Sequence, residues 1–110
     1  MARLAVVVLV AAMVAGCGSA RRGVPVLGPM RLTGPAAAGE VAFMAHCHQC
    51  HPAGEAGIGP ALNNKWLPGW VIRAQVRLGL GAMPWFSREE VSPERLDLIV
   101  AYLQAMRRRG

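Results

Sequence analysis

Residues 46 to 51 read HCHQCH and place three histidines and two cysteines within six positions. The two thiols, Cys47 and Cys50, are separated by two residues, and this spacing serves three kinds of chemistry. Such a pair can form a redox-active disulfide, supply half of a zinc site, or attach a haem through its two vinyl groups. The residues around the motif decide between these three alternatives.

The rest of the chain favours haem. A thioredoxin-like dithiol is expected within a βαβ pattern, and no segment here alternates convincingly as a strand. A structural zinc site needs a second pair of ligands, and neither Cys nor His follows His51. In the haem alternative, Cys47 and Cys50 form thioethers with the vinyl groups, and His51 lies under the iron as its proximal ligand. The motif therefore predicts one covalent haem c with its iron.

Two helices are expected around the motif. The first is predicted from residue 38 to about residue 49 (38–49), so that the motif lies at its end. Its apolar stripe is expected to contain Val41, Ala42 and Ala45. The second is predicted over 70–78, and it ends at a glycine.

A further helix is the clearest element of the chain. It follows Ser92, a good N-cap, with Pro93 at its first position. Its apolar residues recur at i, i+3, i+4 and i+7, namely Leu96, Ile99, Val100 and Leu103. Just before it, Ser87 and Glu90 have the S-x-x-E spacing of a capping box. The sequence therefore predicts an all-α domain.

The N-terminal residues 1–16 have the pattern of an export signal. Arg3 precedes twelve apolar residues, Leu4 to Ala15, whereas a helix that spans a bilayer needs roughly 20. The segment ends in V-A-G-C, which resembles the bacterial lipobox, in which the cysteine is lipidated after cleavage. The resemblance implies lipidation of Cys17, and an ordinary cleaved signal with a free Cys17 is the alternative. Lipidation would also explain the odd total of three cysteines.

Two regions are expected after the signal. Residues 17–37 contain the lipidated cysteine and a Pro- and Gly-rich stretch without apolar periodicity, which we interpret as a flexible tether. The folded domain is expected over residues 38–110. So small a domain usually needs a disulfide, a metal or a large cofactor for stability, and a haem would meet that need.

The formal net charge is +6, but the charge pattern does not indicate a nucleic-acid partner. The basic residues are scattered, and no aromatic residues are interleaved with them as a single-strand-binding surface requires. Export also argues against such a role. We interpret the charge as a solvated basic surface, with attraction to anionic lipids or to an acidic partner as the weaker alternative.

Four stretches of the chain resemble class I cytochromes c. GEVAFMAHCHQCH resembles the family's N-terminal helix and haem motif, with Gly39 and Phe43 at the positions that pack on the C-terminal helix. GIGPAL resembles the family's G-x-G-P-x-L loop. GLGAMPWF resembles the loop of the sixth iron ligand, and LIVAYLQAM resembles the closing helix. The resemblance implies a class I cytochrome c fold, with three to four short helices wrapped around one covalently bound haem.

The resemblance also assigns two further residues. Met83, in GLGAMPWF, is implied as the distal iron ligand, and a soft thioether in that position raises the reduction potential. Pro60, in GIGPAL, is implied to accept a hydrogen bond from the second nitrogen of His51 and so to fix the imidazole. His46 and His48 are too close to His51 in sequence to reach the other face of the haem, and we interpret them as surface residues.

Two axial ligands from the protein leave no open iron position for a substrate. We therefore expect a non-enzymatic carrier of single electrons, which exchanges them with donor and acceptor proteins and has no small-molecule substrate. It is expected to be exported and anchored through Cys17 to a membrane, facing the periplasm or the cell exterior. Two alternatives remain: a dedicated cytochrome subunit of a dehydrogenase complex, and a haem sensor or peroxidase in which Met83 dissociates.

Overall fold

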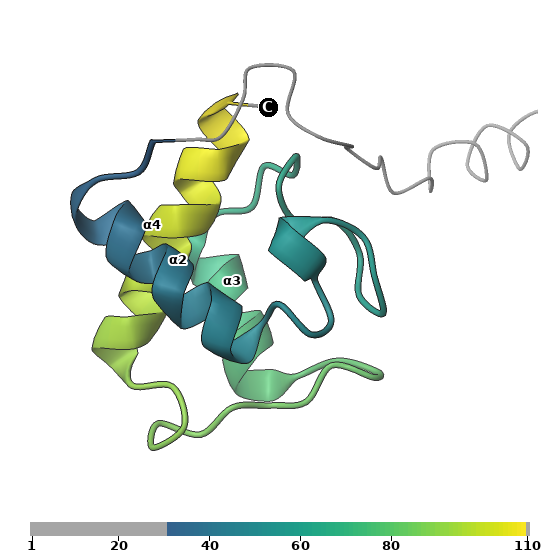
Figure 1. Cartoon of the computed structure of the whole chain (residues 1–110). Helices are drawn as coiled ribbons and strands as arrows, with labels where there is room; N and C mark the ends of the chain where they lie inside the picture. Colours follow the sequence, from purple (N-terminus) through teal and green to yellow (C-terminus); the bar gives the residue numbers. More distant parts are fainter. Residues whose placement is uncertain (1–30, 110) are drawn as a thin grey trace, which may run out of the picture.

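The computed structural model of this protein describes residues 31–109 (Figure 1). The predicted signal, Cys17 and the tether up to residue 30 lie outside the described residues. The helical elements are α2 (Gly34–His46), the 3-10 turn η1 (Pro52–Gly54), α3 (Gly69–Leu78) and α4 (Pro93–Arg109). Within the described range the only β-type pairing is an isolated bridge between Leu80 and Met83, which confirms the predicted all-α class. No helix in residues 31–109 has the length and apolar character needed to cross a membrane.

Helix α2 begins and ends earlier than the sequence predicts. It starts at Gly34, so residues 34–37 belong to the helix and not to the expected tether. A proline lies in its first turn, where a missing N–H costs nothing and the fixed φ suits a helix start. The helix ends at His46, and residues 47–50 form turns. Reading the Pro- and Gly-containing segment as tether therefore placed the start of the helix four residues too late.

The core is centred on the crossing of α2 and α4 (Figure 1). A Cβ built on Gly39 would overlap the backbone carbonyl of Leu98, so the two backbones approach as closely as they do only because this residue is glycine. One turn later Phe43 is completely buried, and its ring centroid lies 5.2 Å from that of Tyr102. This crossing fixes the end of α2 from which the haem motif continues.

The apolar stripe of α4 agrees with its prediction, whereas that of α2 does not. All four predicted residues of α4 are buried: Leu96, Ile99, Val100 and Leu103. On α2, Ala42 is buried, but Val41 is 73% exposed and Ala45 is also exposed. Gly39 and Phe43 are the residues that pack on α4, and together with Ala42 they form the inner face at helical spacing. The predicted stripe was therefore wrong at Val41 and Ala45.

The chain after α3 folds back onto that helix. Phe86 N donates a hydrogen bond of 2.9 Å to Val76 O, so the segment 79–86 returns to the C-terminal part of α3. Ser87 and Glu90 then form the predicted capping box: Ser87 N donates to Glu90 Oε2 at 2.9 Å, and Glu90 N donates to Ser87 Oγ at 3.2 Å. The segment that carries Met83 is thus held at its far end before α4 begins.

Candidate haem site

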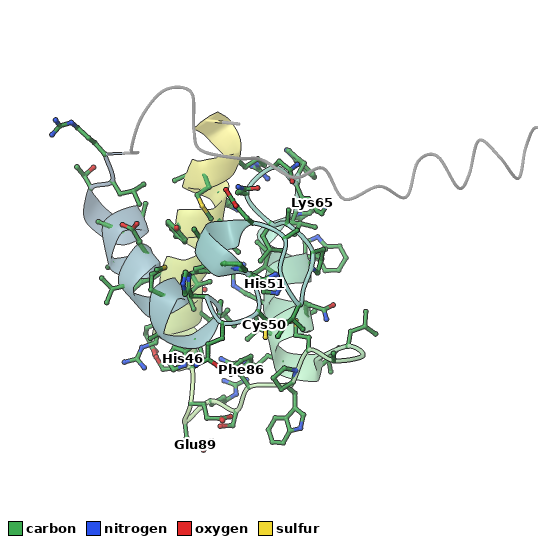
Figure 2. The ribbon with its side chains drawn as sticks, turned by 45° about the vertical axis from the view of Figure 1, so that its right-hand side comes forward. His46, Cys50, His51, Lys65, Phe86 and Glu89 are labelled. Atoms are coloured by element: carbon green, nitrogen blue, oxygen red, sulfur yellow. The ribbon has the colours of Figure 1, made fainter. Side chains whose placement is uncertain are left out.

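The C-x-x-C-H motif forms the turn that follows α2. Cys47 N and His48 N both donate to Phe43 O, at 2.8 and 3.1 Å. His51 N donates to Cys47 O at 2.9 Å, which closes the turn on itself. Figure 2 shows Cys50 and His51 near the middle of the molecule. The α2–α4 crossing therefore positions the predicted attachment thiols through a short turn that is closed by backbone hydrogen bonds.

Both thiols are half-buried, and no disulfide joins them. Burial, with a smaller contribution from Cys50, raises the pKa of the Cys47 thiol to about 11. A zinc site requires thiolates, and within residues 31–109 no three His, Cys, Asp or Glu side chains are placed to hold a metal ion.

His51 is buried, with 7% of its surface exposed, and its orientation is fixed. Its Nδ1 lies 2.8 Å from Pro60 O, the hydrogen bond that the family resemblance implies. A carbonyl oxygen can only accept, so Nδ1 carries the proton. Nε2 therefore keeps the lone pair that a metal needs.

Gly59 explains how the loop before Pro60 closes on this imidazole. A Cβ built on Gly59 would overlap the His51 ring, although the φ of Gly59 is not left-handed. Position 59 therefore requires glycine because there is no room for a side chain, and not because its backbone conformation is one that only glycine adopts. Gly59 N also donates to Cys50 O at 2.9 Å, which ties the loop to the motif.

Met83 lies in a tight turn within the segment that returns to α3. Leu80 N donates to Met83 O at 3.1 Å, and Met83 N donates to Leu80 O at 2.9 Å. The thioether is half-buried and packs against the core. Its sulfur accepts a hydrogen bond of 3.6 Å from Gln75 Nε2 on α3.

A second polar residue of α3 holds the same segment. Arg77 Nη1 donates to Phe86 O at 3.1 Å and to Ser87 O at 2.9 Å. Sequence reasoning missed both Arg77 and Gln75, because polar residues on an amphipathic helix usually face solvent. Only the fold shows that segment 79–86, which contains Met83, returns to α3 and covers Gln75 and Arg77.

The two other histidines have structural contacts. His48 Nδ1 accepts a hydrogen bond of 3.0 Å from Ala53 N, and Ala53 has the uncommon φ of 51°. His46 lies edge-on to Phe86 with 6.4 Å between ring centroids, at the lower end of the molecule in Figure 2. His48 therefore supports the η1 turn, and His46 packs against the end of the Met83 segment.

The residues present fit a covalent haem. The chain offers two thiols, an imidazole with a free Nε2 and a half-buried thioether, which are the kinds of donor that hold a c-type haem with His and Met ligands. This donor set on an all-α scaffold defines a c-type cytochrome domain.

Comparison with known proteins gives the family. Residues 34–103 match the family described as cytochrome c oxidase, cbb3-type, subunit III, and the chain belongs to this family of c-type cytochrome domains. The chain is also 38% identical over 60 residues to the 4-cresol dehydrogenase [hydroxylating] cytochrome c subunit of Pseudomonas putida. That alignment covers 54% of this chain and 52% of the relative, so the chain spans about half the length of that protein. No solved structure was found to match.

Family membership establishes the cofactor and the coarse function. The chain is a small monohaem c-type cytochrome, its cofactor is a covalently bound haem c with iron, and it carries electrons.

Proposed function

We propose that this protein is a one-electron carrier in which Cys47 and Cys50 attach the haem, and His51 and Met83 are the two axial ligands. The observation that carries the proposal is the buried His51, whose Nδ1 is bound to Pro60 O and whose Nε2 is thereby left for iron. Haem iron supplies the Fe(III)/Fe(II) couple. The chain supplies the two axial ligands, His51 and Met83, and both are held by contacts within the protein that do not depend on a substrate.

The protein's own residues limit how far the ligands move. Pro60 and Gly59 confine the imidazole, and the Leu80–Met83 turn restricts the thioether backbone. A site with both axial positions filled by the protein suits electron transfer and leaves no position for a substrate. The chain is accordingly proposed to be a carrier and not an enzyme.

Exposed apolar side chains near the Met83 segment support exchange with partner proteins. Leu78, Leu80 and Trp85 are 77%, 74% and 64% exposed. Large apolar side chains exposed beside the segment of the proposed distal ligand are suited to brief docking, which is typical of small redox interfaces. We therefore propose protein donors and acceptors, with contact made at this end of the molecule.

The dehydrogenase-subunit alternative has one specific observation in its favour. The similar protein of Pseudomonas putida is named as the cytochrome c subunit of 4-cresol dehydrogenase. A fixed subunit would use the same haem ligands as a free carrier and would differ in its stable partner. Co-purification of a larger catalytic protein with the native chain would favour the subunit, and recovery of the chain alone would favour the carrier.

The membrane anchor is a separate proposal. Cys17, which lies outside the described residues, ends a lipobox-like sequence, and we propose that its lipids hold the domain at a membrane outside the cytoplasm. In the native host, Cys17→Ser is expected to move the protein from the membrane to the soluble fraction. Ser19→Ala is the matched control, because it leaves the cysteine in place. Membrane retention of the Cys17→Ser protein would refute the anchor.

The axial ligands are tested by absorption spectra of the holoprotein, oxidised and reduced, with and without carbon monoxide. Met83→Ala is expected to abolish the weak red charge-transfer band of a Met–Fe(III) bond and to allow carbon monoxide to bind the reduced protein. Met44→Ala is the control, because Met44 is 44% exposed on α2 and is not a proposed ligand.

Three results would contradict these assignments. Persistence of the band in Met83→Ala would show that another residue is the distal ligand. Rapid carbon monoxide binding to the unaltered protein at neutral pH would favour the sensor or peroxidase alternative over the carrier. Absence of covalent haem from the exported protein would refute attachment at Cys47 and Cys50.

A further inference from the structure

The sulfur of Met83 has a hydrogen-bond donor in addition to its apolar contacts. Gln75 Nε2 lies 3.6 Å from Met83 Sδ, within the range of hydrogen bonds to sulfur, and the pair is partly buried. A thioether has no hydrogen to donate, so the amide N–H is the donor and the sulfur is the acceptor. The contact joins the last turn of α3 to the segment that follows that helix.

Backbone hydrogen bonds fix both sides of this contact. Gly79 N donates to Gln75 O at 2.8 Å, so Gln75 belongs to the last regular turn of α3. The paired hydrogen bonds between Leu80 and Met83 close the turn on the other side, and Phe86 N is bound to the helix beyond it. The amide and the sulfur therefore meet because the chain is pinned before and after them.

The hydrogen bond has a chemical consequence for a ligating thioether. A thioether sulfur has two lone pairs, and a hydrogen bond to one of them leaves the other for iron. It also withdraws electron density from the sulfur, and a poorer donor stabilises Fe(III) less than Fe(II). Hydrogen bonds to the atoms that ligate a metal are a recognised means of setting ligand orientation and reduction potential.

We propose that Gln75 is a positioning residue for Met83, which orients the sulfur and raises the reduction potential of the haem. This inference rests on the proposed function, because it requires Met83 to be the distal ligand. The amide of Gln75 is uncharged, so its influence acts through the sulfur it contacts and not through a long-range field.

The test is the reduction potential of the purified holoprotein. Gln75→Leu removes the donor and keeps a side chain of comparable bulk. At a fixed ambient potential the ratio of reduced to oxidised protein is expected to fall about threefold, which for a one-electron couple is a potential lower by about 30 mV. The Met–Fe(III) band should remain, because the ligand itself is unchanged. Gln104→Leu is the matched control, since it makes the same substitution on α4 and is expected to leave the potential unaltered.

Gln75→Asn is the second variant, in case Gln75→Leu folds poorly. It keeps the amide but shortens the side chain by one methylene, so the donor no longer reaches the sulfur, and the same fall in potential is expected. Unchanged potentials in both variants, with the band intact, would overturn the role of Gln75.

Met83→Ala separates that failure from a failure of the proposed function. If Met83→Ala keeps the band, Met83 is not the ligand and the inference about Gln75 is overturned with it. If Met83→Ala loses the band while the Gln75 variants keep the potential of the unaltered protein, the ligand assignment stands and only the role of Gln75 is wrong.

Discussion

His51 and Met83, the two proposed iron ligands, are held by different kinds of force. His51 is buried, bound through Nδ1 to Pro60 O, and so closely covered by Gly59 that a single added carbon would overlap its ring. Met83 is half-buried in a turn and packs against the core; Gln75 donates a hydrogen bond to its sulfur, and Arg77 holds the end of its segment at Phe86 O and Ser87 O. The imidazole is therefore confined mainly by close packing, whereas the Met83 sulfur and the end of its segment also depend on hydrogen-bond donors from α3.

This difference predicts which of the two ligands can move away from its position without unfolding of the protein. Overlap of a closely packed ring cannot be relieved by a small movement, because protein interiors are nearly as dense as organic crystals. A hydrogen-bonded segment at the surface can open locally at a small cost in free energy. We therefore expect changes on the His51 side to affect folding and haem incorporation, and changes on the Met83 side to affect ligand retention in a protein that is otherwise intact.

The largest effect is expected from Gly59→Ala. The new Cβ would overlap the imidazole, which is held by the Pro60 hydrogen bond and cannot turn aside. The free energy of unfolding should fall by about 3 kcal/mol, at the upper end of the range for overpacked sites, and the yield of covalent haem should fall with it. Denaturant unfolding of the holoprotein and haem content per polypeptide are the measurements.

Gly81→Ala is the matched control in the Met83 segment. Gly81 has a φ of 58°, and a Cβ built there would meet no atom within 4 Å. Only the left-handed backbone opposes that substitution, at about 1–2 kcal/mol, and haem incorporation should be normal. Equal losses of haem in the two alanine variants would contradict the claim that volume confines the His51 side.

The hydrogen bond between His51 and Pro60 agrees with the expectation from the family resemblance, and the two residues are close together in the chain. Cys47, Cys50 and His51 form one motif, and Pro60 follows within the same loop. The spacing of the motif indicates haem chemistry, and the family resemblance adds the role of Pro60. The stripe of α4 could be predicted for the same reason, since helical periodicity is itself a local property.

The supports of Met83 could not be predicted in this way. Gln75 and Arg77 look like the solvated face of α3, and their partners depend on the return of the chain from Gly79 to Phe86. The apolar stripe predicted for α2 was wrong at Val41 and Ala45 for a related reason. Apolar periodicity alone chose the wrong face, because the close approach of two backbones at Gly39 decides which face meets α4; only the family resemblance pointed to Gly39 and Phe43.

A smaller effect, confined to the Met83 side, is expected from Arg77→Leu. The substitution removes the donor from Phe86 O and Ser87 O, so the end of the segment keeps only the hydrogen bond from Phe86 N to Val76 O as its link to α3. The cost should be about 1–2 kcal/mol, because each bond involves a charged donor but the pair is only partly buried. On heating, the Met–Fe(III) band of the variant should be lost at a lower temperature than its helical circular dichroism signal. In the unaltered protein the two signals are expected to be lost at closer temperatures.

Arg73→Leu, one turn earlier on α3, is the control for that experiment. Arg73 pairs with Asp97 at 2.8 Å, and their side chains are 45% and 61% exposed. An exposed ion pair contributes only about 0–1 kcal/mol, and this one is not connected to the Met83 segment. Arg73→Leu should therefore leave the band and the helical signal to melt together as they do in the unaltered protein. If Arg77→Leu behaves in the same way as Arg73→Leu, hydrogen bonds from α3 are not what retains Met83, and the contrast between the two ligands is lost.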